Sequence, residues 1–135
     1  MWPRVLAGGI LWAAVYNLVW GVAWFAFMRN EWIAAMAAIH RRLPFNADIW
    51  IFWIALTLPI GMAIIAYAAG PAHSDQAAKA AIYASAALWL LMTLGMAVWA
   101  WQQSIHARTV ALDSLVNLTA MVVASLAGGR IVRRN

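Results

Sequence analysis

The sequence contains no cysteine, which excludes disulfides, thiol redox chemistry and thiolate ligands for a metal. Acidic residues are also scarce: four Asp and Glu residues stand against nine Lys and Arg, and charged residues make up only 10% of the chain. No serine is paired with a base in a pattern typical of nucleophilic catalysis, and no glycine-rich loop is present to cradle a phosphate. We therefore expect that the protein is not an enzyme.

What the sequence does contain is hydrophobic residues, which make up 67% of its 135 positions. The mean hydropathy of +0.79 lies far above that of soluble domains. Roughly 24 uncharged residues separate Arg4 from Arg29, enough for one helix to cross a hydrocarbon core about 30 Å thick. Further apolar runs give predicted spans at approximately 5–28, 49–70, 80–101 and 109–129. The fold class is therefore all-α, an integral membrane four-helix bundle forming a single transmembrane domain over 1–135.

Basic residues lie at both ends of these spans. The side shared by the N-terminus, the second connection and the C-terminus carries Arg4, Lys79, Arg130, Arg133 and Arg134. The opposite side carries Arg29, Arg41, Arg42 and Arg108. The positive-inside rule slightly favours both termini in the cytoplasm. Because the net charge of +5 sits at the membrane interfaces, we expect a lipid bilayer as its partner and no nucleic acid.

The connection between the first two spans is patterned as an amphipathic helix over 31–43. Asn30 suits an N-cap, Glu31 begins the first turn, and apolar residues recur at helical spacing until Pro44. These apolar residues are Trp32, Met36, Ile39 and Leu43. An interfacial helix would bury them in lipid and turn the neighbouring arginines toward phosphates. The alternative is that the first span continues for a turn or two beyond the membrane.

Two spans carry stripes of small and polar residues. In the first span the stripe is Gly9, Ala13, Asn17 and Gly21, and in the last it is Asp113, Asn117, Ala120, Ala124 and Gly128. Small residues let helices approach closely in membranes. Counted from a common surface, Asn17 and Asn117 both lie about 13–16 Å deep. We therefore expect these two amides to face each other.

Thr57 and Thr93 fall at a similar depth in the other two spans, so each predicted helix contributes one residue to a midplane polar layer. We prefer a structural interpretation, in which interhelical hydrogen bonds fix the helix register. The alternative is a polar cavity that binds a ligand or passes a substrate. Asp113 joins the candidate residues as the only acid inside a predicted span. It lies about one and a half turns below the surface, within reach of water or arginines, and we prefer a structural role for it too.

The three histidines fall at helix ends or in loops: His40, His73 and His106. None lies within a span, where an axial ligand for a haem would be needed. We expect neither a cofactor nor a metal.

Three stretches carry a resemblance to known proteins: RVLAGGILWAAVYNLVWG, NEWIAAMAAI and LVNLTAMVVASLAGG. Together they resemble an uncharacterised family of small four-helix bacterial inner-membrane proteins, for which no activity is established. The resemblance implies a location in the bacterial cytoplasmic membrane. It also implies an acid in the last span, where this chain has Asn117.

Ten tryptophans, many near the predicted interfaces, and faces rich in alanine leave broad apolar surfaces. We expect a non-catalytic membrane subunit or assembly protein that docks on a larger membrane complex or on copies of itself. The competing hypothesis is a small transporter or binder of an apolar or lipid-like molecule, using the midplane polar layer.

Overall fold

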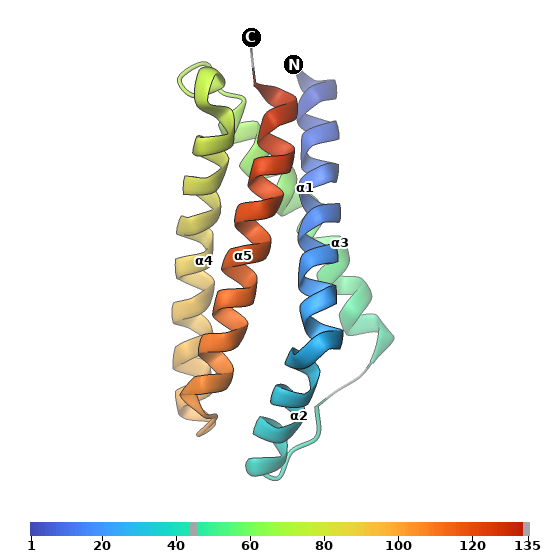
Figure 1. The fold of residues 1–135 in the computed structure, drawn as a ribbon, viewed down its shortest axis with the longest axis vertical. Helices are drawn as coiled ribbons and strands as arrows, with labels where there is room; N and C mark the ends of the chain where they lie inside the picture. Colours follow the sequence, from blue (N-terminus) through green and yellow to red (C-terminus); the bar gives the residue numbers. More distant parts are fainter. Residues whose placement is uncertain (44–45, 134–135) are drawn as a thin grey trace.

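The computed structural model describes residues 1–43 and 46–133, and its regular elements in these ranges are all helical (Figure 1). The elements are α1 (Trp2–Ala23), the π-helical turn η1 (Trp24–Met28), α2 (Arg29–Ala38), α3 (Ala47–Ala68), the 3-10 turn η2 (Ser74–Gln76), α4 (Ala77–Gln102) and α5 (Ala107–Val132). Pro44 and Arg134, which enter the expectations above, lie outside the described residues.

Four helical segments are long and apolar enough to cross a membrane: Trp2–Ala38, α3, α4 and α5. This confirms the prediction of an all-helical chain with four apolar helices and suggests a membrane protein. The N-terminus, the end of α5 and the hairpin between α3 and α4 lie together at one end of the bundle (Figure 1).

In the first connection the structure matches the alternative, a continuation of the first span, and does not show the separate interfacial helix that we prefer from the sequence. α1 passes through η1 directly into α2, with a bend visible in Figure 1, so this part of the chain continues the first span. Single π-helical turns inside α-helices are rare and often occur at functional sites. The helix expected over 31–43 ends at Ala38, and His40 then adopts a left-handed backbone conformation with φ of 57°. Beyond Ala38 the helical spacing of Ile39 and Leu43 predicts more helix, but the backbone turns at His40 instead.

Glycines allow α1 to pack closely against two neighbours. A Cβ added at Gly128 of α5 would lie 2.6 Å from the carbonyl oxygen of Gly8, and one added at Gly9 would lie 2.8 Å from the Cα of Met62 in α3. The stripe predicted in the first span therefore forms a close contact at Gly9, and Ala13 beside it is buried. Gly21 has nothing within 4 Å of its added Cβ and takes no part in this contact.

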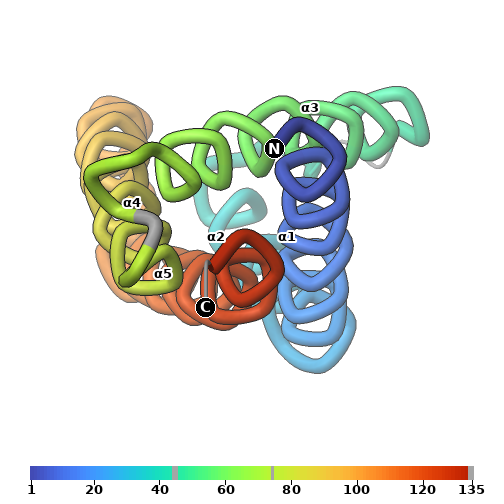
Figure 2. Tube along the Cα trace, turned by 90° about the horizontal axis from the view of Figure 1, so that it is seen from above, coloured from blue at the N-terminus to red at the C-terminus, as the bar shows by residue number. Residues whose placement is uncertain are grey.

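Two apolar cores occupy opposite ends of the bundle. The first gathers around Trp12, Ile65 and Ala124, and the second around Met28, Trp32 and Ala100. The helix α3 supplies buried residues only to the first. Figure 2 shows the reason: α3 is tilted across the bundle, with its end near α4 and its beginning farther away. The segment 47–56 accordingly has no buried residue.

Candidate functional site

Asn17 joins α1 to α3. Its Nδ2 donates to Thr57 Oγ1 at 2.7 Å and to the backbone oxygen of Ala13 at 2.8 Å. The Thr57 hydroxyl in turn donates to the carbonyl of Ile54 at 2.7 Å. Thr57 is buried and Asn17 half-buried, so the predicted polar residues of these two helices do meet inside the bundle.

Asn117 bonds to the residue next to Asn17 rather than to Asn17 itself. The Tyr16 hydroxyl donates to Asn117 Oδ1. Consecutive side chains on a helix point about 100° apart, so Tyr16 turns toward α5 while Asn17 turns toward α3. The expected facing pair of amides is replaced by two separate links from α1.

Asp113 is 95% buried, since only 5% of its surface is exposed. Its Oδ1 accepts a hydrogen bond from Trp32 Nε1 at 3.3 Å, and its Oδ2 accepts one from Asn117 Nδ2 at 3.0 Å. Asp113 therefore ties α5 to α2 instead of reaching water. The arginine expected nearby, Arg108, pairs with Glu31 at 3.0 Å, which makes a second and exposed link between the same two helices.

The apolar face predicted for the first connection packs against protein. Trp32 and Met36 are buried in the second core, and Ile39 and Leu43 are half-buried against it. Their partners include Ile105, which lies just before α5, and Val110 in the first turn of α5.

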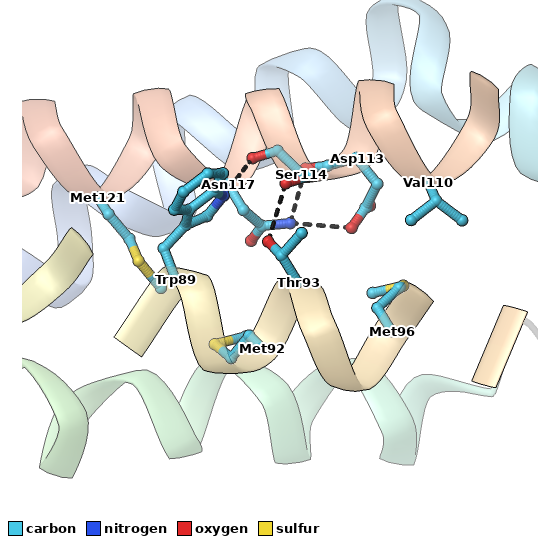
Figure 3. Close-up of a pocket in the computed structure, with 9 residues that line it drawn as sticks. All are labelled: Trp89, Met92, Thr93, Met96, Val110, Asp113, Ser114, Asn117 and Met121. Atoms are coloured by element: carbon cyan, nitrogen blue, oxygen red, sulfur yellow. Dashed lines mark hydrogen bonds between the residues drawn. The ribbon is translucent and has the colours of Figure 1, made fainter. Parts of the chain in front are cut away.

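Thr93 bonds to α5, as Figure 3 shows. Its hydroxyl shares a 2.8 Å hydrogen bond with that of Ser114, and Trp89 Nε1 donates to the Ser114 carbonyl at 2.8 Å. Each of the four residues predicted for the polar layer therefore makes a side-chain hydrogen bond to another helix. Four further residues join the same network of hydrogen bonds: Tyr16, Trp32, Trp89 and Ser114.

A second polar link was missed in the sequence. The fully buried Trp12 donates from Nε1 to Ser125 Oγ at 3.1 Å, and Ser125 and Ser85 share a 2.8 Å hydrogen bond. Both serines lie inside the predicted apolar spans, where a hydroxyl needs a hydrogen-bond partner, and this position could have identified them as candidates. This link binds α1, α4 and α5 about two helical turns from the Asn117 group, since Ser125 lies eight residues along α5.

The space beside the polar layer is small. Between α4 and α5 lies a cavity of about 20 Å³, the size of one water molecule, and the atoms that face it are almost all apolar (Figure 3). Side chains that line it include Trp89, Met92, Met96 and Met121. Within the described ranges, every buried side-chain nitrogen and oxygen has a hydrogen-bond partner. The arrangement can fix helix positions, and its polar atoms are already engaged.

Among the residues that the structure describes, no three His, Asp or Glu side chains come together as a metal site. Comparison with known proteins found no matching family model, no matching curated protein and no matching solved structure. The geometry of this chain must therefore carry the functional argument by itself.

Proposed function

We propose that the protein is a non-catalytic integral membrane subunit that docks sideways, through the first half of α3, on a larger membrane complex or on copies of itself. The observation that carries this proposal is the absence of any buried residue in the described segment 47–56, although that segment is strongly apolar.

The exposed side chains of this segment are large. Ile51, Phe52, Trp53 and Ile54 expose between 51% and 65% of their surface. The second half of α3, in contrast, buries Thr57, Gly61, Ile64, Ile65 and Ala68. A membrane helix gains stability from close packing against other helices, which fluid lipid does not provide to the same degree. In the first half of α3, Trp50 packs against the rings of Trp20 and Trp24, whereas most other side chains of the segment are exposed and lack such packing.

The helix α4 also carries exposed apolar side chains. Leu91, Leu94 and Val98 each expose 55% or more of their surface. These side chains lie opposite Trp89 and Met96, which pack on the two cores, so they form a second outward-facing surface that is separate from the first half of α3. A transmembrane helix of a partner that packs beside the first half of α3 would cover the exposed side chains of that segment.

The polar layer supports a structural rather than a ligand-binding role. Its donors and acceptors bond to one another, as between Asn17 and Thr57, and they leave no polar group directed into the adjoining cavity. Hydrogen bonds of this kind between membrane helices contribute on average about 0.6 kcal/mol each to stability, which supports a role in fixing the helix register.

The location that we propose is the bacterial cytoplasmic membrane with both termini in the cytoplasm. The basic residues at the terminal end, among them Arg4, Lys79 and Arg130, support this orientation. At the opposite end Arg41 and Arg42 are exposed just beyond α2, where they suit contacts with lipid phosphates. In this arrangement α2 extends the first span to the membrane surface, and its apolar face packs on α5.

One observation favours the second candidate, a binder of an apolar or lipid-like molecule. Three methionines line the small cavity between α4 and α5: Met92, Met96 and Met121. Methionine side chains are flexible and can repack to enlarge a cavity for an apolar guest. This candidate requires a bound small molecule in the purified protein.

Photocrosslinking tests the leading proposal. A photoreactive amino acid at Ile51 or Trp53 should give one protein adduct of defined mass in the native membrane, either with a partner or with a second copy. Leu6 and Val123 are matched controls, because they are exposed on helices that pack along their lengths, and they should give lipid adducts. Lipid adducts alone at all four positions would contradict the proposal.

A further inference from the structure

An open pocket lies at the hairpin between α3 and α4, away from the polar layer. Its volume is about 370 Å³, and it lies between the last turn of α3 and the first turns of α4. The polar and aromatic side chains that line it are Tyr67, His73, Asp75, Gln76, Lys79 and Tyr83. The pocket does not depend on the proposed docking function.

The pocket carries one charge of each sign, and the two are not paired with each other. Asp75 and Lys79 are both exposed and stand four residues apart. No salt bridge joins these two side chains, whereas Arg108 and Glu31 do form one at the opposite end of the bundle. A carboxylate and an ammonium therefore face the same open space with their charges available.

Each tyrosine ring in the pocket already has one face occupied. The Lys79 Nζ lies 5.7 Å from the centre of the Tyr83 ring, and the His73 ring lies 4.7 Å from that of Tyr67. These contacts position the ammonium and the imidazole beside the two rings.

The pocket lies at the depth of lipid headgroups. α4 has 26 residues and is roughly 39 Å long, longer than a hydrocarbon core of about 30 Å. From Ala80 to the end of α4 no charged residue occurs, so Lys79 marks the polar end of the span. Tyrosine is enriched at this level, where its ring contacts lipid and its hydroxyl reaches water.

We propose that this pocket binds the headgroup of a membrane phospholipid that carries both a phosphate and a primary ammonium, of the phosphoethanolamine type. The Lys79 ammonium and the His73 ring N–H donate to the phosphate oxygens. The Asp75 carboxylate and the Gln76 side-chain oxygen accept hydrogen bonds from the primary ammonium, which has three N–H donors. An anionic headgroup without an ammonium would leave Asp75 near a negative charge, and a choline headgroup has no N–H to donate.

Native mass spectrometry of the full chain in detergent tests the assignment. Short-chain phosphatidylethanolamine, phosphatidylglycerol and phosphatidylcholine are titrated in turn, and the ethanolamine lipid should bind most tightly. Lys79→Gln and Asp75→Asn should each weaken it about tenfold, the loss expected for one charge-assisted hydrogen bond. Asp75→Asn should leave binding of the glycerol lipid unchanged or improved. Arg130→Gln is the control, because Arg130 is exposed at the same end of the bundle but outside the pocket.

Three results would overturn the proposal. The first is equal affinity for the three lipids. The second is unchanged binding of the ethanolamine lipid in both pocket variants, or a loss of the same size in Arg130→Gln. The third is binding of water-soluble glycerophosphoethanolamine as tight as that of the lipid, which would assign the pocket to a free phosphate ester. Far weaker binding of the soluble compound supports a membrane lipid as the ligand.

Discussion

Asn17 of α1 donates its side-chain amide to the Thr57 hydroxyl of α3 at 2.7 Å, while the next residue toward the N-terminus, Tyr16, donates to Asn117 of α5. Two consecutive residues of one helix thus bond to two different neighbours. α1 is held between α3 and α5 by this pair, and glycine contacts at Gly8 and Gly9 bring the same two helices close to it.

A double-mutant cycle should detect the bond between Asn17 and Thr57. Asn17→Ala and Thr57→Ala should show a coupling of about 0.6–1.7 kcal/mol in the free energy of unfolding. The coupling is modest because the Thr57 hydroxyl keeps its own acceptor, the carbonyl of Ile54. Denaturation with SDS in mixed micelles measures it. The control combines Asn17→Ala with Thr93→Ala, and the two effects should be additive because Thr93 bonds to Ser114. Zero coupling between Asn17→Ala and Thr57→Ala would mean that the hydrogen bond between these two side chains does not contribute to stability.

The contact between Gly8 and Gly128 should not tolerate one added methyl group. Gly128→Ala places a Cβ 2.6 Å from a backbone oxygen, which cannot move aside without a shift of the helix. We expect a loss of about 1–3 kcal/mol in unfolding free energy. Gly21→Ala is the matched control, since nothing lies within 4 Å of its added Cβ, and it should cause no loss. Equal stability of the two variants would mean that α1 and α5 are not in close contact.

Asp113 should act as a hydrogen-bond acceptor that holds α2 against α5. Asp113→Asn keeps an acceptor oxygen for Trp32, whereas Asp113→Leu leaves the buried indole N–H without a partner, at a cost of about 1–3 kcal/mol. The readout is thiol labelling of Ala35→Cys in α2, where Ala35 is 3% exposed. Labelling should accelerate in the Leu background and stay slow in the Asn background. Arg108→Ala, which breaks only the exposed pair with Glu31, should cost no more than about 1 kcal/mol.

If Asp113→Asn labels as fast as Asp113→Leu, both carboxylate oxygens are needed, because Asp113 accepts from Trp32 and from Asn117 and an amide has only one acceptor oxygen.

The topology predicts the side from which single cysteines react. Asp75→Cys in the α3–α4 hairpin and Arg133→Cys after α5 should be labelled by an impermeant reagent from the same side of the membrane, the cytoplasmic one. His106→Cys, at the opposite end of the bundle, should react from the other side. Labelling of Asp75→Cys and Arg133→Cys from opposite sides would contradict four spans.

The four apolar helices could be predicted from the sequence because hydrocarbon demands long uncharged runs. Their ends could not, since a helix continues past the apolar run when its residues suit it: α4 begins at Ala77 rather than near Ala80, and α5 extends to Val132. The sequence offered the extension of α1 into α2 only as an alternative, and it did not indicate the π-helical turn η1 between them. A change of one π-helical turn leaves no mark in hydropathy.

The members of the polar layer could be predicted by depth alone, but their partners could not. Depth follows from counting residues, whereas the direction of a side chain follows from helix rotation and tilt. Tyr16 therefore took the place expected for Asn17 opposite Asn117. Ser85 and Ser125 were missed because serine is small and common in membrane helices. The sequence does not show that α1, α4 and α5 bring these two hydroxyls together with the Trp12 indole.

The central claim, that the protein docks on a larger membrane complex or on copies of itself, is tested most directly by the mass of the complex extracted together with its native lipids. The chain is extracted at native expression level in polymer-bounded lipid discs, and native mass spectrometry determines which proteins are released from one disc. A docking subunit predicts a defined complex, with a second protein in constant ratio or more than one copy of the 14.8 kDa chain. A single copy released with lipids alone, or with one bound small molecule, would contradict the claim.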